Sequence, residues 1–300
     1  VAERPLATDP QAVQRAPGAA PPAPIPPAEA ARKRRVEGSS LTFTLPEIRG
    51  NVVDWFPDDH PNPMPSIIKQ GPVALGSGTR PCGACHLSDG SGRPENSSPA
   101  GLPAKYILRQ LDDFRNGRRH SVEPGKGNSN TMVMLAKAMT DEEMKQAADY
   151  FSAVKWRPHV KVIETDMVPA TRIQGELFIP TVNKATEHKL TEPIGNRIIE
   201  VPTDVESNQI LRNSRGTWVA YVPVGAIARG RNLVTTGGSS IVSNQIVLGR
   251  ATACTTCHGQ DLRGMGADIP PLAGRSPSYL AREIFDIQQG MRAGSYPLMP

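Results

Sequence analysis

The sequence predicts a mainly α-helical protein in which two similar helical units are joined by an irregular insert with short strands and preceded by an extended N-terminal arm. Three observations lead to this prediction. A segment made of a short motif, a loop and a helix occurs twice, over residues 82–117 and 254–290. β-Branched residues gather in short stretches between the two copies. The N-terminal segment, residues 1–40, is rich in proline and alanine.

Length and composition allow two domains of ordinary size and leave part of the chain outside a packed core. The 300 residues include 30 Pro, 27 Gly and only 3 Trp, 5 Tyr and 6 Phe, and hydrophobic residues make up 38%. The formal charge of +5 comes without a stripe of Lys and Arg interleaved with aromatics, so no nucleic-acid partner is expected. No apolar run is long enough for a transmembrane helix, and no signal peptide is present in the given sequence.

The four cysteines carry the strongest functional signal. They form two copies of Cys-x-x-Cys-His, and none is left over. This motif is typical of covalent haem attachment, because two thiols two residues apart can add to the two vinyl groups of one haem and the adjacent His then reaches the iron. The predicted cofactors are therefore two haem c groups. The residues predicted to hold them are Cys82, Cys85, His86, Cys254, Cys257 and His258.

Other uses of these cysteines fit the pattern less well. Four-Cys zinc sites usually have their pairs about 15–20 residues apart. Here Cys85 and Cys254 are 169 positions apart, and each pair has its own His. A thioredoxin-like redox pair is expected once, beside a strand, and plain disulfides are the third alternative.

Residues 1–59 are predicted to form a Pro/Ala-rich arm and a lead-in to the first unit. Eight prolines precede position 28, a basic run occupies residues 32–35, and no apolar periodicity is present over residues 1–40. This composition favours an extended, poorly ordered arm, which is either solvated or docked along a partner protein.

The first unit is predicted over residues 60–156. A Gly/Ser-rich loop follows the first motif, and the helical spacing of Ile107, Leu111 and Phe114 predicts a helix that ends at Gly117. A polar loop comes next, followed by a last helix with its own apolar stripe.

The second unit, residues 224–300, repeats this order. A Gly-rich loop follows the second motif, and the next helix ends at Gly290. The spacing from Tyr106 to Gly117 equals the spacing from Tyr279 to Gly290, so the repeat extends beyond the motifs themselves. The given sequence has no counterpart of the last helix of the first unit.

An insert, residues 157–223, separates the two units. β-Branched residues gather in segments 160–163, 196–201 and 217–222, with prolines and glycines between them. This pattern predicts a few short strands.

A sixth iron ligand must come from elsewhere in each unit, and a Met thioether is usual where a haem carries electrons. Met132 and Met134 both lie in the expected loop before the last helix of the first unit, which begins with a capping box at Thr140. Either methionine can be the ligand of the first haem, and Met299 is the comparable candidate in the second unit. The weaker alternatives are Met265, Met291, His60, His120, His159 and His188.

These residues resemble class I c-type cytochromes, and more narrowly the tandem dihaem cytochromes of the c-four type. The resemblance covers about half the chain, residues 78–155 and 224–300. The segments that carry it are 106–117, 132–141, 254–264, 270–274 and 279–290.

The resemblance also implies roles for single residues. In that family the ligand Met lies about eight residues before the Ser or Thr that opens the last helix, which implies Met132 rather than Met134. It implies haem-pocket packing by the helices of Tyr106 and Tyr279, and it implies a haem-flanking loop at Pro271. The expected fold is then two class I cytochrome c-like domains.

The predicted function is single-electron transfer, with no catalysis by the chain itself. Expected partners are redox proteins such as a dehydrogenase, an oxidase or another cytochrome. The chain would act as a free carrier or as a subunit held in a complex, and a partner could bring it to a membrane. Haem attachment implies export to the bacterial periplasm. The alternative is a catalytic dihaem enzyme that oxidises sulfur compounds or reduces peroxide, which needs an open or labile sixth position.

Overall fold

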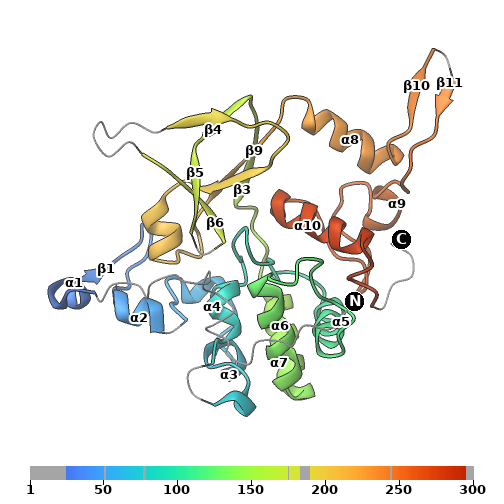
Figure 1. Ribbon diagram of the computed structural model, residues 1–300. Helices are drawn as coiled ribbons and strands as arrows, with labels where there is room; N and C mark the ends of the chain where they lie inside the picture. Colours follow the sequence, from blue (N-terminus) through green and yellow to red (C-terminus); the bar gives the residue numbers. More distant parts are fainter. Residues whose placement is uncertain are drawn as a thin grey trace.

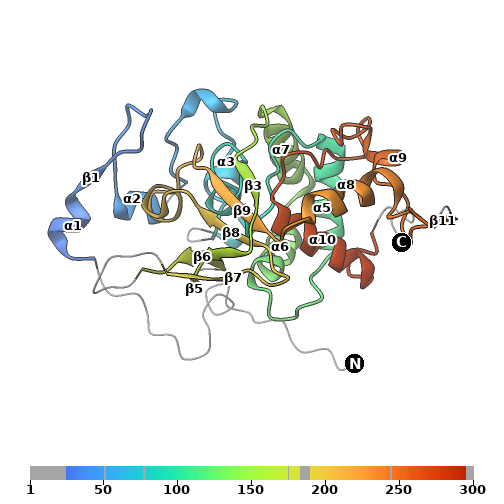
Figure 2. The same cartoon turned by 90° about the horizontal axis from the view of Figure 1, so that it is seen from above.

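The computed structural model describes residues 25–50, 52–76, 79–174, 176–182, 190–243 and 245–294. Within these ranges the helices of residues 66–153 lie together, those of residues 226–288 lie beside them, and the short helices of residues 27–50 lie apart from both (Figures 1 and 2). None of the helices in these ranges is both long and apolar enough to cross a membrane.

The first unit is helical and is built around one apolar core. Its elements are α3 (Ser66–Lys69), η3 (Val73–Leu75), α4 (Cys82–His86), α5 (Ala104–Arg115), α6 (Gly127–Ala138) and α7 (Asp141–Ala153). The predicted stripe of Ile107, Leu111 and Phe114 on α5 is buried in this core together with side chains of α6 and α7. The predicted capping box is present, because Thr140 Oγ1 accepts the Glu143 N–H at 3.1 Å and the Glu143 carboxylate accepts the Thr140 N–H at 2.7 Å.

Met132 and Met134 lie within helix α6, so the prediction that they sit in a loop is wrong. The polar loop ends earlier than expected, and α6 begins at Gly127. Met, Leu, Ala and Lys are all good helix formers, and burial of Val133 and Ala136 holds this segment against the core. A helix therefore continues almost to the start of α7.

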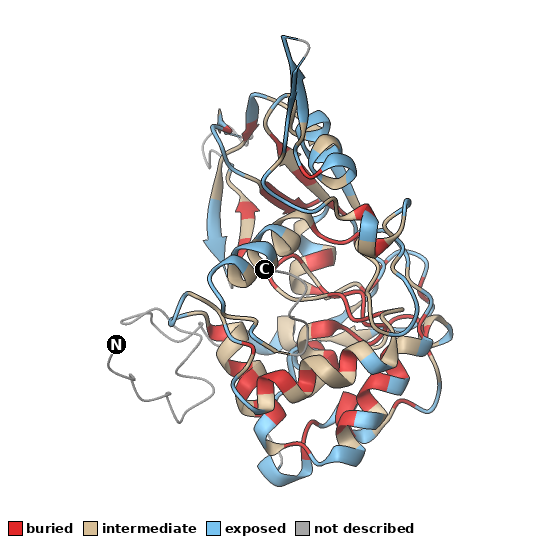
Figure 3. Cartoon of the chain, turned by 90° about the vertical axis from the view of Figure 1, so that its right-hand side faces the viewer, coloured by how far each residue is buried: buried red, intermediate tan, exposed pale blue. Residues whose placement is uncertain are grey.

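The second unit contains α8 (Ala226–Thr236), β10 (Ser240–Val242), β11 (Gln245–Val247), α9 (Thr255–His258) and α10 (Pro277–Gln288). Helix α10 begins where Ser276 Oγ accepts the Tyr279 N–H at 3.2 Å. The hairpin of β10 and β11 is exposed along its length and projects from the molecule (Figure 3). Residues 295–300, and with them Met299, lie outside the described residues.

Strands occupy the insert. β3 (Val160–Glu164), β9 (Trp218–Val222) and β8 (Ile199–Pro202) form a sheet in that order, with β3 parallel and β8 antiparallel to β9. These three strands fall on the three segments that the β-branched residues indicated. The other elements are β4 (Met167–Pro169) with β7 (Thr191–Pro193), β5 (Thr171–Gln174) with β6 (Leu177–Pro180), and the π-helical turn η4 (Glu206–Ile210).

Residues 25–40 are folded, so the expectation of an extended, poorly ordered arm is wrong for this part; residues 1–24 lie outside the described residues. Val36 is buried in a small apolar core with Trp55, and Trp55 Nε1 donates to the Leu211 carbonyl of the insert at 2.7 Å. A high proline content does not reveal this packing, because the core is completed by a residue far away in the sequence. The elements here are α1 (Pro27–Ala31), β1 (Lys33–Arg34), β2 (Phe43–Thr44), α2 (Leu45–Gly50) and η2 (Pro57–Asp59).

The insert and the second unit both contact the first unit directly. Arg275 of the second unit is buried, donates to the carbonyls of Ser98 and Ala100 at 2.6 and 3.0 Å, and lies over the Trp156 ring. Asp268 of the second unit pairs with cationic side chains of α5. The two units therefore meet despite the long insert between them.

Candidate functional site

The first motif forms helix α4, a single turn that brings both thiols and the histidine together. Pro81 precedes the helix, and Leu87, with φ of 66°, ends it. His86 is buried, and its Nδ1 lies 2.9 Å from the Ser97 carbonyl oxygen. Because a carbonyl oxygen can only accept, Nδ1 carries the proton and Nε2 keeps its lone pair for a metal.

The second motif repeats this geometry. His258 is buried at the end of α9, and its Nδ1 lies 2.8 Å from the Pro270 carbonyl oxygen. The predicted haem-flanking residue Pro271 comes next in the chain, so the carbonyl that orients the ring belongs to its neighbour. Both histidines therefore present the same nitrogen for ligation.

The loops after the two motifs are also equivalent. Gly92 and Gly264, each six residues after the motif histidine, donate their N–H to the carbonyls of His86 and His258 at 3.0 and 2.8 Å. Both have positive φ, 68° and 84°, and a Cβ on either would overlap backbone atoms across the loop. Only glycine fits both constraints, so the loop that carries the orienting carbonyl is built the same way twice.

The donor set fits covalently attached haem. All four cysteines are free thiols in this structure. Among the described residues, no group of three or more His, Cys, Asp or Glu side chains is arranged to hold a metal ion. Burial raises the pKa of the Cys82 thiol to about 12. Burial, with a smaller contribution from the Arg119 charge, lowers the pKa of His86 and keeps the imidazole neutral for ligation.

The two candidate methionines of the first unit are both half-buried on α6. Met132 packs against the apolar core of the unit, as Cys82 does. In the second unit, Met265 is half exposed, and the backbone carbonyl of Met291 accepts the His120 N–H at 3.0 Å.

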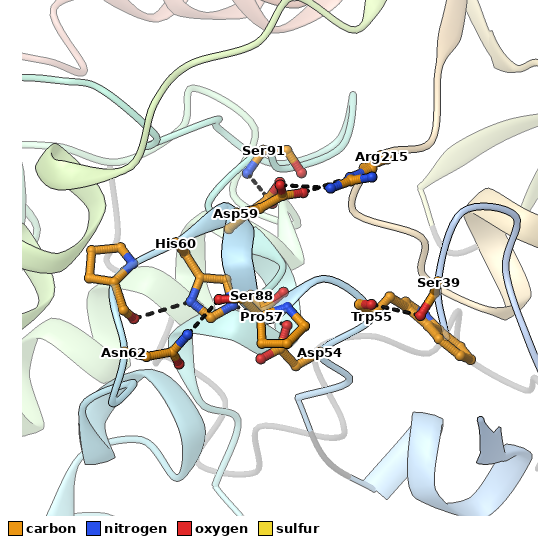
Figure 4. Close-up of polar contacts among 12 residues, drawn as sticks. Ser39, Asp54, Trp55, Pro57, Asp59, His60, Asn62, Ser88, Ser91 and Arg215 are labelled. Atoms are coloured by element: carbon orange, nitrogen blue, oxygen red, sulfur yellow. Dashed lines mark hydrogen bonds and ion pairs between the residues drawn. The ribbon is translucent and has the colours of Figure 1, made fainter. Parts of the chain in front are cut away.

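The histidine alternatives are engaged elsewhere or lie outside the described residues. His60 has Nε2 3.0 Å from Asp54 and Nδ1 3.2 Å from the Pro61 carbonyl, so both ring nitrogens face acceptors (Figure 4). Burial acts to lower the pKa of His60, but these hydrogen bonds outweigh it and raise the pKa. Nδ1 of His159 faces the Arg157 carbonyl at 3.4 Å. His188 lies outside the described residues.

The hydroxyl groups of Tyr106 and Tyr279 each accept a hydrogen bond from an arginine of the opposite unit. Arg119 Nη2 donates to the Tyr279 hydroxyl at 3.1 Å, and Arg292 Nη2 donates to the Tyr106 hydroxyl at 3.3 Å. The positive charge of these arginines is evident from the sequence, but their tyrosine partners across the units are not. The repeat contains a signal for their equivalence, since each arginine lies two residues after the glycine that ends its helix.

The chain is similar to known cytochromes. The sequence model of the cytochrome c family matches residues 78–155. Cytochrome c4 from Pseudomonas aeruginosa is 33% identical over 213 residues, which are 70% of this chain and 68% of that protein. A thiosulfate dehydrogenase electron acceptor from Stutzerimonas stutzeri is 26% identical over 213 residues, 70% of this chain and 64% of that protein. A solved structure of cytochrome c4 from Acidithiobacillus ferrooxidans has a TM-score of 0.40 at 20% identity, covering 73% of this chain and 85% of that chain.

Two repeated motif helices with buried, carbonyl-anchored histidines define a c-type cytochrome with two haem attachment sites. More narrowly, the chain belongs to the cytochrome c4 family of dihaem cytochromes, and two haem c groups are its cofactors. The chain spans a little under two thirds of the length of the Stutzerimonas stutzeri relative.

Proposed function

We propose that this chain passes single electrons between a donor protein and an acceptor protein through its two haems. The observation that carries the proposal is the repeated histidine geometry, with Nδ1 of His86 and of His258 committed to a backbone carbonyl and each ring buried. When bound, haem supplies one-electron Fe(II)/Fe(III) chemistry. The chain orients the ligands, excludes water and holds the two units in contact.

The chain's own residues complete each site in this proposal. Cys82 and Cys85 anchor the first haem, and the corresponding thiols of the second motif anchor the second. Met132 and Met299 are the proposed sixth ligands, and two filled axial positions favour a carrier over a catalyst. The comparisons give no support to the catalytic alternative.

A dehydrogenase is the proposed electron donor, and the bacterial periplasm is the proposed compartment. The relative named as an electron acceptor of thiosulfate dehydrogenase supports a donor of this class. Organisation into a first cytochrome domain (60–156), an insert (157–223) and a second cytochrome domain (224–300) is part of the same proposal.

The test combines intact mass with visible spectra of the exported, haem-loaded protein. We expect a mass that exceeds the polypeptide by two haems, reversible oxidation by hexacyanoferrate(III) with two electrons per molecule, and no carbon monoxide complex of the reduced protein. The double substitutions Cys82→Ala/Cys85→Ala and Cys254→Ala/Cys257→Ala should each remove one haem. Fewer than two haems in the unmodified protein, or rapid binding of carbon monoxide, would overturn the proposal.

A further inference from the structure

The two units meet through equivalent residues. Arg119 and Arg292 occupy the same position in the repeat, and they pair with each other as an antiparallel backbone bridge. Next to this bridge the His120 N–H donates to the Met291 carbonyl at 3.0 Å. Pairing of a residue with its own counterpart is what a local twofold relation between the units produces.

The side chains around this bridge follow the same relation. Arg119 reaches into the second unit and contacts the Tyr279 hydroxyl and both Glu283 carboxylate oxygens, each at 3.1 Å. Arg292 reaches into the first unit and contacts the Tyr106 hydroxyl at 3.3 Å and the Gln110 amide oxygen.

Gln110 and Glu283 are also counterparts, because each lies seven residues before the glycine that ends its helix. The two units differ in charge at this position, because Gln110 is neutral and Glu283 is acidic. Arg119 donates to the Gln110 amide oxygen at 2.9 Å, and Arg292 also pairs with Glu283 at 2.6 Å. Among the described residues, Arg119 and Arg292 thus share one carboxylate, Glu283, which belongs to the second unit.

The carboxylate is largely shielded from solvent. The side chains of Glu283, Arg119 and Arg292 are only 17%, 11% and 15% exposed. Burial acts to raise the pKa of Glu283, but the charges of the two arginines outweigh it and hold the pKa below its ordinary value. Charges in such a place are screened by water and salt much less than surface charges.

We propose that Glu283 lowers the reduction potential of the second haem relative to the first, an effect that its neutral counterpart Gln110 does not exert on the first haem. This inference rests on the proposed function. The arginines and tyrosines occur once in each unit, so their effects on the two haems cancel by symmetry. A negative charge on the second unit's own helix stabilises the oxidised state of that unit's haem. In the half-reduced protein this charge therefore shifts electron sharing toward the first haem.

The experiment exchanges the two side chains. Glu283→Gln and Gln110→Glu are made singly and together, and the double variant keeps the composition of the contact while moving its carboxylate to the first unit. Spectroelectrochemical titration gives both potentials. Haem methyl NMR signals, assigned through contacts with residues of each motif, show which haem holds the electron.

Each single substitution should shift electron sharing toward the second haem by about three- to tenfold, where tenfold corresponds to about 59 mV for one electron. The double variant should show the largest shift. Glu142→Gln, at an exposed position on α7, controls for loss of one surface carboxylate and should change sharing less than Glu283→Gln does.

Two haems that titrate normally with unchanged sharing in the double variant would overturn this inference and leave the proposed function standing. Loss of a haem from the unmodified protein would instead count against the proposed function. If Glu283→Gln fails to fold, the double variant still decides the question, because it retains a buried carboxylate between the arginines.

Discussion

Each motif histidine depends on a backbone carbonyl rather than on a side chain. Ser97 orients His86 and Pro270 orients His258, and these two residues share only a carbonyl oxygen at the same place in the loop. The residue type at this position can therefore differ between the two units, whereas the backbone path of the loop must be the same in both. The glycine at the sixth position after each histidine sets that path.

Gly92→Ala should weaken the first haem site because its Cβ would overlap the Ser97 carbonyl across the loop, at a positive φ. We expect the free energy of unfolding to fall by roughly 1–3 kcal/mol and the yield of fully haem-loaded protein to drop. Denaturant unfolding and intact mass measure both effects. Gly50→Ala is the control, since its Cβ meets no atom within 4 Å, and it should stay within about 0.5 kcal/mol of the unmodified protein. Equal behaviour of the two variants would contradict the prediction.

Met132→Ala should remove the sixth ligand of the haem held by His86. The weak absorption of the Met–iron bond at the red end of the oxidised spectrum should disappear for that haem, and its reduction potential should fall. Met134→Ala, two residues away on the same helix, is the matched control and should leave both properties unchanged. The reverse result would assign the ligand to Met134.

Among the elements, the insert is tied to the start of α10 by one buried carboxyl group. Glu200 on β8 accepts hydrogen bonds from Ser276 Oγ and Ser278 Oγ at 2.7 and 2.6 Å. Glu200, which belongs to the insert, thus accepts hydrogen bonds from two serines at the start of helix α10 of the second unit. The insert therefore has a structural part in positioning the second unit, which its short strands alone did not indicate.

Burial raises the pKa of Glu200 above its ordinary value of 4.5, although the hydrogen bonds from Ser278 and Ser276 act in the opposite direction. A carboxyl group with a raised pKa in the folded state contributes stability that is fully present below the unfolded pKa and is lost as pH rises through the folded pKa. Glu200→Gln removes this titration. Relative to the unmodified protein, its free energy of unfolding should therefore increase as pH rises above about 4.5.

Denaturant unfolding at several pH values between about 4 and 7 measures this difference. Glu37→Gln, at an exposed position, is the control and should follow the unmodified protein across the range. Parallel curves for Glu200→Gln and the unmodified protein would show that Glu200 does not titrate in the way its burial implies.

For the whole molecule, the arginines of the haem units are mostly paired. Arg118 contacts Asp112 and Asp113, and Arg109 pairs with Asp268 of the other unit at 2.6 Å. Haem propionates would further offset the formal charge of +5. The protein therefore has little unbalanced charge for long-range attraction.

Electron transfer to an acidic partner should accordingly depend weakly on salt. We expect the rate of oxidation by hexacyanoferrate(III), used as an anionic probe in stopped flow, to fall by less than about tenfold between low and physiological ionic strength. A cationic cobalt(III) complex supplies the comparison. A larger fall with the anion, absent with the cation, would reveal long-range steering and contradict the paired arrangement.

Much of the fold could be predicted because its signals are local. The stripe on α5, the capping box of α7 and the stretches of β-branched residues each lie within one element. The predictions that were wrong concern segments whose structure depends on distant partners. Residues 25–40 fold because Trp55 and Leu211 complete their core, and the helix that contains Met132 is held by packing of α6 against residues of α5 and α7.

The sequence by itself determined the chemistry of this protein. Five consecutive residues, used twice, supply two thiols and an imidazole for each haem, and that requirement is met by covalent spacing alone. Only the tertiary structure decided which carbonyl orients each histidine and that Arg119 and Arg292 cross between the units. The physical reason is that these contacts join side chains and loops from separate elements, and across the units they join residues far apart in the chain, so no local pattern of residues specifies them.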